Sequence, residues 1–300
     1  MKVNFNNIYE KIYKASKEEL SNIKKKNTKD ILMLLMIIGI VLLILFFVNK
    51  VLMAMALFSS FIVFIIFVSK KENKFREIYK FEVIRTLVEE YSKDLKFSPL
   101  SSLTRREYAN SRFDINFDRF RTEDEINGKL SQGDTIKMAQ VTTYKEEYVD
   151  DGNGGTEKRE VMTFNGLYGY VILNTPIFNN ITITTNYNAK RYDKNRIEVE
   201  SSEFEKLYDL YAIDKVQAME IFTSELIEKF VKLNENKKYI FNMKIENSTI
   251  YFRYRCGEIF EPPLLSEGVD FKLLYKYFST INFPIEIIEE IIEKSKAVGI

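Results

Sequence analysis

Two long apolar runs stand out in the first part of the chain. They cover residues 31–48 and 51–68, contain no charged residue, and are separated only by Asn49 and Lys50. A helix of this length rises about 27 Å, close to the hydrocarbon core of ~30 Å that a helix must cross. The pattern predicts two transmembrane helices joined by a very tight turn, residues 31–69 in all.

Three other structures would also be apolar at these positions. A buried hairpin in a soluble protein is disfavoured because soluble core helices usually keep a polar edge. A signal peptide is disfavoured because a polar segment of residues 1–30 precedes the first run and a second run follows it at once. A re-entrant hairpin with both ends at one membrane face remains open and leaves the topology of the rest unchanged.

Basic residues flank the two runs on one side only. The turn offers Lys50 alone, and positive residues near helix ends stay on the cytoplasmic side. We therefore expect a multi-pass protein of the cell membrane with both termini cytoplasmic and the turn outside. The flanking residues are Lys2, Lys11, Lys14, Lys17, Lys24, Lys25, Lys26 and Lys29 before the runs, and Lys70, Lys71, Lys74, Arg76 and Lys80 after them.

Apolar positions continue at helical spacing on both sides of the runs. We expect residues 1–30 to form a cytosolic amphipathic helix and residues 70–98 a stalk helix, packed antiparallel and ended by Pro99. An N-terminal helix lying on anionic lipid is the alternative, which its lysines favour. The predicted seam consists of Tyr9, Tyr13, Ser16, Leu20 and Ile23 on the first helix and of Phe81, Ile84, Val88, Tyr91 and Leu95 on the second.

Residues 99–300 carry the pattern of a cytosolic α+β domain. A short helix and a strand near residues 119–130 come first. Residues 136–149 and 160–173 are rich in Thr, Tyr, Val and Ile around a turn of Asp, Asn and Gly, which predicts a β-hairpin. The turn also suggests a calcium loop, but the ligands that such a loop needs at fixed offsets are missing. A solvated turn is therefore favoured.

The remaining pattern adds strands and helices in mixed order. Strands are predicted at residues 181–186 and 196–200, and a second hairpin at residues 239–245 and 249–254. Together these elements indicate helices packed on an antiparallel sheet. The helical signals are the apolar positions Met219, Phe222, Leu226, Phe230 and Leu233, a cap at Thr223 or Ser224, a cap at Asp270, and Pro284 as the start of a last helix.

Composition excludes several classes of chemistry. The net charge is +1, whereas a general nucleic-acid binder has a strong basic excess, so we expect no nucleic-acid partner. The chain has no histidine, which removes Ser-His-Asp catalysis and histidine-based zinc sites. The single cysteine, Cys256, cannot form an internal disulfide, in agreement with a reducing compartment. We expect no cofactor.

A series of short motifs resembles the bacterial family DUF3137, a domain of unknown function. The resemblance extends from about Ser101 to Ile292, and members often carry two membrane helices ahead of the domain. It implies fold boundaries but no catalytic residue, because no activity is assigned to the family. The motifs are Phe164-Asn-Gly166, the block from Ile197 to Phe204, Tyr208, Tyr211-Ala-Ile-Asp214, Ala218 and Ile221-Phe-Thr223.

Two sets of charged residues are candidate binding residues. Glu198 and Glu200 would share one face of a strand about 7 Å apart, which suits a metal ion or acid-base work. A solvated strand face, or carboxylates near a helix start, is the competing explanation. Arg253 and Arg255 would present guanidinium groups to phosphate or to carboxylates of a partner, or would lie on a polar sheet face.

Two more residues invite a structural or a chemical role. Asp214 is expected to cap a helix. Cys256 is a reactive thiol only if a cationic neighbour lowers its pKa.

Because no catalytic constellation is visible, we expect a membrane-anchored binding or scaffold module that contacts the lipid bilayer and a protein partner. A module that senses lipid or anions, and a metal-dependent enzyme built on carboxylates, are the two alternatives.

Overall fold

The computed structural model describes residues 4–114, 116–150, 155–177, 180–185, 193–234, 240–262 and 269–298. Contacts divide the chain into two compact units. The first comprises Met1–Glu90 and Phe260–Tyr275, and the second comprises Tyr91–Ile259 and Lys276–Ile300.

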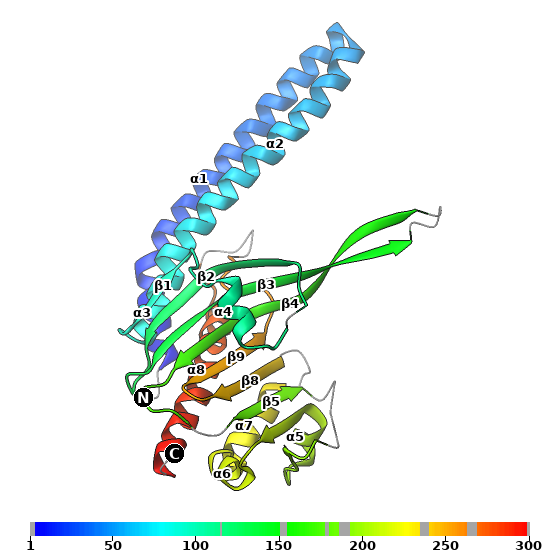
Figure 1. The fold of residues 1–300 in the computed structure, drawn as a ribbon. Coiled ribbons are helices and arrows are strands. Elements are labelled where there is room, and N and C mark those ends of the chain that lie inside the picture. The colour runs from blue at the N-terminus through cyan, green and yellow to red at the C-terminus, as the bar shows by residue number, and fades with distance from the viewer. Residues whose placement is uncertain are drawn as a thin grey trace. The chain divides into compact units, whose positions relative to one another are not determined.

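The first unit is built on two long antiparallel helices, α1 (Phe5–Val48) and α2 (Lys50–Tyr79), which lie side by side (Figure 1). Asn49 is the whole turn. Its N–H donates to the Leu45 carbonyl of α1 at 2.9 Å, and its Oδ1 accepts from the N–H of Val51 in α2 at 2.8 Å. One residue thus ends the first helix and begins the second, as the two apolar runs predict.

The helices continue beyond the apolar runs. α2 leads into a π-helical turn, η1 (Lys80–Ile84), and then into α3 (Arg85–Tyr91). Lys71 donates to Asp30 at 2.6 Å and links the two helices just past the apolar runs. The helix ends at Tyr91, so the expectation of a helical Leu95 is wrong: Leu95 begins strand β1 (Leu95–Ser98).

The buried faces of the two helices match the predicted seam only in part. Ser16, Leu20, Ile84 and Val88 are buried as expected. The buried face of α1 also includes Phe5, Ile8 and Ile12. Tyr9 instead packs edge-on against Phe271, with ring centroids 4.9 Å apart. Phe81 is 54% exposed, against the expectation that it lies in the seam.

The second unit carries a nine-stranded sheet among the residues that the structure describes. Its order is β1-β2-β3-β4-β9-β8-β5-β7-β6, and every neighbouring pair is antiparallel. The α+β class is therefore confirmed. The remaining strands are β2 (Arg119–Lys129), β3 (Thr135–Asp150), β4 (Thr156–Ile172), β5 (Ile181–Thr185), β6 (Arg196–Ile197), β7 (Tyr208–Ala212), β8 (Ile240–Glu246) and β9 (Thr249–Arg255).

Both predicted hairpins are present, β3 with β4 and β8 with β9. Residues 151–154 of the first turn, which bear the calcium alternative, and Tyr239 lie outside the described residues. β3 and β4 run on beyond their other neighbours, because β2 pairs only as far as Tyr144 and β9 pairs only with residues 167–172. The paired residues 145–150 and 156–161 form a two-stranded ribbon (Figure 1).

Helices cover both faces of the sheet. On one face, α4 (Arg105–Asn110) places Tyr108 against Phe164 and Tyr168 of β4. On the other face, Phe283 contacts Phe241 of β8 at 5.2 Å. Phe283 lies in α8 (Phe271–Ala297), and α7 (Ser224–Asn234) packs on the same face.

Two sequence expectations fail in this unit. Pro284 does not open a last helix but lies inside α8, where buried Ile281 and Ile288 flank it on either side. The packing of that apolar face outweighs the ~3 kcal/mol that a proline costs inside a helix. β6 ends at Ile197, so Glu198 and Glu200 are not strand residues.

Candidate functional site

Glu198 and Glu200 line an open groove of about 470 Å³ in the second unit. They lie in the segment between β6 and α5 (Ser202–Leu207), on either side of the buried Val199. α6 (Lys215–Ile221) contributes Met219 to the lining, and α7 contributes the opposite wall.

Hydrogen bonds fix this segment at its base. Arg196 Nε donates to Asp209 Oδ1 at 2.8 Å, and the guanidinium group also pairs with Glu205. Glu205 Oε1 accepts from the N–H of Val199 at 2.8 Å, and the Ser201 hydroxyl caps α5. The hydrogen bond to Asp209, supported by Glu205, raises the pKa of Arg196 although burial opposes the shift. These ion pairs and the hydrogen bond to Val199 hold that residue inward, and Glu198 and Glu200 on either side of it are exposed.

The groove has an apolar floor and an acidic rim. Val199 and Ile227 are buried in the floor, beside Met219 and Val231. Lys232 lies 2.8 Å from the carboxylate of Glu228 and neutralises one negative charge of the rim. The rim remains negatively charged, because the other carboxylates outnumber this lysine. The rim carboxylates are Glu198, Glu200, Glu203 and Glu228.

An exposed apolar stripe leads into the groove along α6. Ile213, Val216 and Met219 are 67%, 73% and 38% exposed and recur every three residues. Asp214 starts the helix by accepting from the N–H of Gln217 at 3.1 Å, as expected for a cap. Large apolar side chains that gather on a surface beside a groove are typical of a contact with another molecule.

The acidic rim does not form a compact metal site. Among the described residues, neither Glu198 nor Glu200 belongs to a group of three metal-ligating side chains whose ligand atoms lie within 4.8 Å of one another. Glu198 is 91% exposed at its side chain, 3.9 Å from the Arg196 guanidinium. Such an arrangement suits a basic partner better than a dehydrated ion.

Arg253 and Arg255 lie elsewhere in the sheet, since β8, β5 and β7 separate their strand β9 from β6. Arg253 packs over the Phe113 ring at 5.2 Å, and burial lowers its pKa. Arg255 donates to the Thr163 carbonyl at 2.6 Å. Both are thus engaged by their own domain, and the structure does not bring them together with the glutamates.

Cys256 is not an activated thiol. Burial raises its pKa to about 11, although a backbone hydrogen bond at Leu167 and the positive charge of Lys276 oppose this increase. At neutral pH the thiol therefore stays protonated.

The sequence pattern missed the exposed stripe. The helical spacing of Met219 and Phe222 suggested one buried face, but Met219 is 38% exposed. The predicted cap at Thr223 or Ser224 agrees with the structure, in which α6 ends at Ile221 and α7 begins at Ser224. The signal that was available is the apolar triplet at Ile213, Val216 and Met219, which is out of phase with the buried Ala218 and Ile221.

These features define a class: a protein with two candidate membrane-spanning helices followed by an α+β domain on an antiparallel sheet. The sequence model of the family described as "Protein of unknown function (DUF3137)" matches residues 162–292. The matched residues, which include the groove and the stripe, are similar to this family. No curated protein and no solved structure matches the chain.

Proposed function

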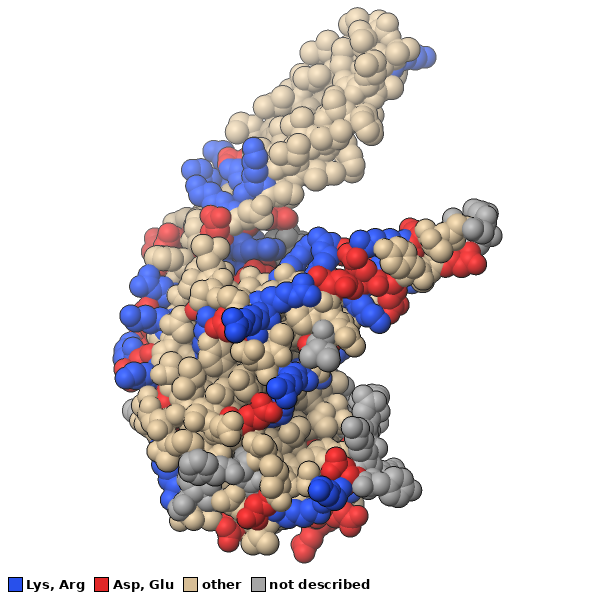
Figure 2. Space-filling view, viewed as in Figure 1, with Lys and Arg blue, Asp and Glu red and all other residues tan. Residues whose placement is uncertain are grey.

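We propose that this protein is a membrane-anchored scaffold whose cytosolic domain binds a protein partner. Two apolar helices anchor it as a multi-pass protein, with both termini cytoplasmic because most of the flanking basic residues lie at the end of the helix pair opposite the turn. Figure 2 shows the apolar pair uncharged along its length, with basic residues at its base and at its tip.

The exposed stripe of Ile213, Val216 and Met219 beside the acidic groove carries this proposal. Its chemistry specifies the partner segment: apolar residues for the floor, and lysine or arginine for the rim. An amphipathic helix with a basic edge meets both needs. The apolar contact supplies most of the affinity, and the rim charges set specificity and association rate.

Photo-cross-linking in cells tests the proposal. A photoreactive phenylalanine analogue replaces Val216 in the full-length chain, and in a second strain it replaces Tyr148, which is 71% exposed on the ribbon. We expect a discrete adduct from position 216 that is absent from position 148. The adduct is identified by mass spectrometry, and its cross-linked peptide should carry lysine or arginine beside apolar residues.

A matched pair of charge variants makes the test specific. In the position-216 strain, Glu200→Gln with Glu203→Gln should reduce the adduct at least threefold, since both carboxylates lie on the rim. Glu147→Gln with Glu157→Gln removes the same charge from the exposed ribbon and should leave the adduct unchanged. Equal adducts from positions 148 and 216, or equal effects of the two pairs, would overturn the proposal.

A further inference from the structure

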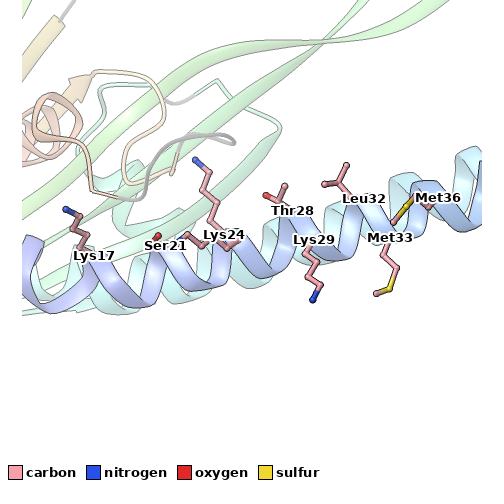
Figure 3. Close-up of a pocket in the computed structure, with 9 residues that line it drawn as sticks. Lys17, Ser21, Lys24, Thr28, Lys29, Leu32, Met33 and Met36 are labelled. Atoms are coloured by element: carbon pink, nitrogen blue, oxygen red, sulfur yellow. The ribbon is translucent and has the colours of Figure 1, made fainter.

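A second groove, of about 820 Å³, runs along α1 in the first unit. Its lining begins with basic and hydroxyl side chains and ends with apolar ones, from Lys17 to Met36. In Figure 3, Lys24, Thr28 and Leu32 point to one side of the helix, and Lys29 and Met33 point to the other. Residues of both sets line the groove.

Helical geometry explains the groove. Residues four apart form ridges on a helix, and a groove lies between neighbouring ridges. One ridge runs through Lys24, Thr28, Leu32 and Met36, and the next through Ser21, Lys25, Lys29 and Met33. The short hydroxyl side chains among the lysines deepen the groove at its basic end.

Two lysines at the basic end of the groove, Lys25 and Lys29, make no ion pair of 4 Å or less among the described residues. The adjacent carboxylate, Asp30, is already held by Lys71 of α2 at 2.6 Å. Two ammonium groups therefore face the groove where the apolar run begins, which is the depth of lipid headgroups for a helix that crosses a bilayer.

We propose that this groove binds one phospholipid with a negatively charged headgroup. The phosphate lies between Lys25 and Lys29. An acyl chain follows the helix along Leu32, Met33 and Met36. The proposal rests on membrane insertion of α1, and it adds a specific lipid to the anchor.

The shape of the groove favours a lipid over a small anion. A free phosphate would use only the basic end, whereas the groove continues into the apolar run past Leu32, which is 56% exposed. An acyl chain can pack against these apolar side chains, whereas a soluble anion has no apolar part that could do so.

Native mass spectrometry of the full-length chain in detergent tests the proposal. The probes are phosphatidylglycerol, phosphatidylcholine and inorganic phosphate. We expect phosphatidylglycerol to bind with one-to-one stoichiometry, and about tenfold more tightly than phosphatidylcholine. Lys25→Gln with Lys29→Gln should weaken phosphatidylglycerol binding about tenfold.

The control pair is Lys14→Gln with Lys26→Gln, which removes the same charge from α1 at positions outside the groove lining. It should change binding less than twofold, whereas a general basic surface would respond equally to both pairs. Ser21→Phe with Thr28→Phe fills the groove at constant charge and should also weaken binding, with unchanged circular dichroism as a folding check.

Three results would overturn the lipid site. The two lysine pairs could have equal effects, the two lipids could bind equally well, or inorganic phosphate could displace phosphatidylglycerol. Carbonate extraction of membranes separates this failure from failure of the anchor. A chain released by carbonate is not inserted, whereas an inserted chain with no lipid preference refutes the groove alone.

Discussion

The motif Phe164-Asn-Gly166 requires glycine at its last position. A Cβ atom at this position would lie 2.1 Å from the Tyr254 carbonyl oxygen and 2.9 Å from the Cα of Arg255. Both atoms belong to the backbone of β9, which begins to pair with β4 at the next residue, Leu167. Only glycine allows the two strands to meet at this distance.

Gly166→Ala should therefore destabilise the domain by about 2–4 kcal/mol, because the backbone of β9 has to move away. The midpoint of chemical denaturation in detergent measures the change. Gly39→Ala is the control, since a methyl group at that position would have no atom within 4 Å. If Gly166→Ala had the same denaturation midpoint as the wild-type protein, this would contradict the close approach of β4 and β9 at Gly166.

Glu107 combines a cap with an ion pair. Burial would raise its pKa, but hydrogen bonds from Tyr170 at 2.6 Å, from Thr104, and from Lys137 at 3.0 Å outweigh burial and lower the pKa to about 2. Because the folded pKa lies below the ordinary value of 4.5, the stabilisation is fully present above pH 4.5 and is lost as the pH falls toward 2.

Glu107→Gln keeps an oxygen for the cap of α4 but removes the charge. We expect it to lower the free energy of unfolding by about 2 kcal/mol at pH 7, with a smaller difference from wild type at pH 3. Denaturation at both pH values measures this difference. Glu147→Gln, on the exposed ribbon, should follow wild type throughout, and a constant difference for Glu107→Gln would refute the linkage.

At the scale of single elements, the short helix α6 depends on its first residue. Asp214 Oδ1 accepts from Gln217, and the helix has too few residues to persist without help. Asp214→Ala should lower the free energy of unfolding by about 1 kcal/mol, while Asp214→Asn, which keeps the acceptor, should stay within a few tenths. Equal loss in both variants would assign the effect to charge rather than to the cap.

The elements with a clear period could be predicted, and those governed by tertiary contacts could not. The local pattern of apolar, polar and capping residues predicts three kinds of feature. These are the two β-hairpins, the caps at Asp214 and Asp270, and the two long helices. β7 was missed because Tyr208–Ala212 is buried at almost every position and shows no alternation. Pro284 was misread because the local rule ignores the buried face of α8.

The candidate site was predicted only in part. Glu198 and Glu200 are brought to one groove, but by the ion pairs of Arg196 and not by a shared strand face. The predicted cap at Thr223 or Ser224 indicated a second helix there, but it did not indicate that Met219 would be exposed. Charge and spacing in the sequence could indicate Glu198 and Glu200 as candidates. The groove that they line could be found only from the folded structure.

At the scale of the whole molecule, the proposed orientation is open to chemical labelling. In a Cys256→Ala background, Asn49→Cys should react with a membrane-impermeant maleimide added to intact cells. Ser202→Cys, which is exposed in the domain, should react only after the membrane is opened. Labelling of Ser202→Cys in intact cells would place the domain outside and reverse the topology.

The one-residue turn at Asn49 has a bearing on signalling. In the proposed topology, a turn of one residue leaves almost no polypeptide on the far side of the bilayer to contact a soluble ligand there. That topology would leave the surrounding lipids and helices, and the proposed cytosolic domain, as the main surfaces through which a signal could act.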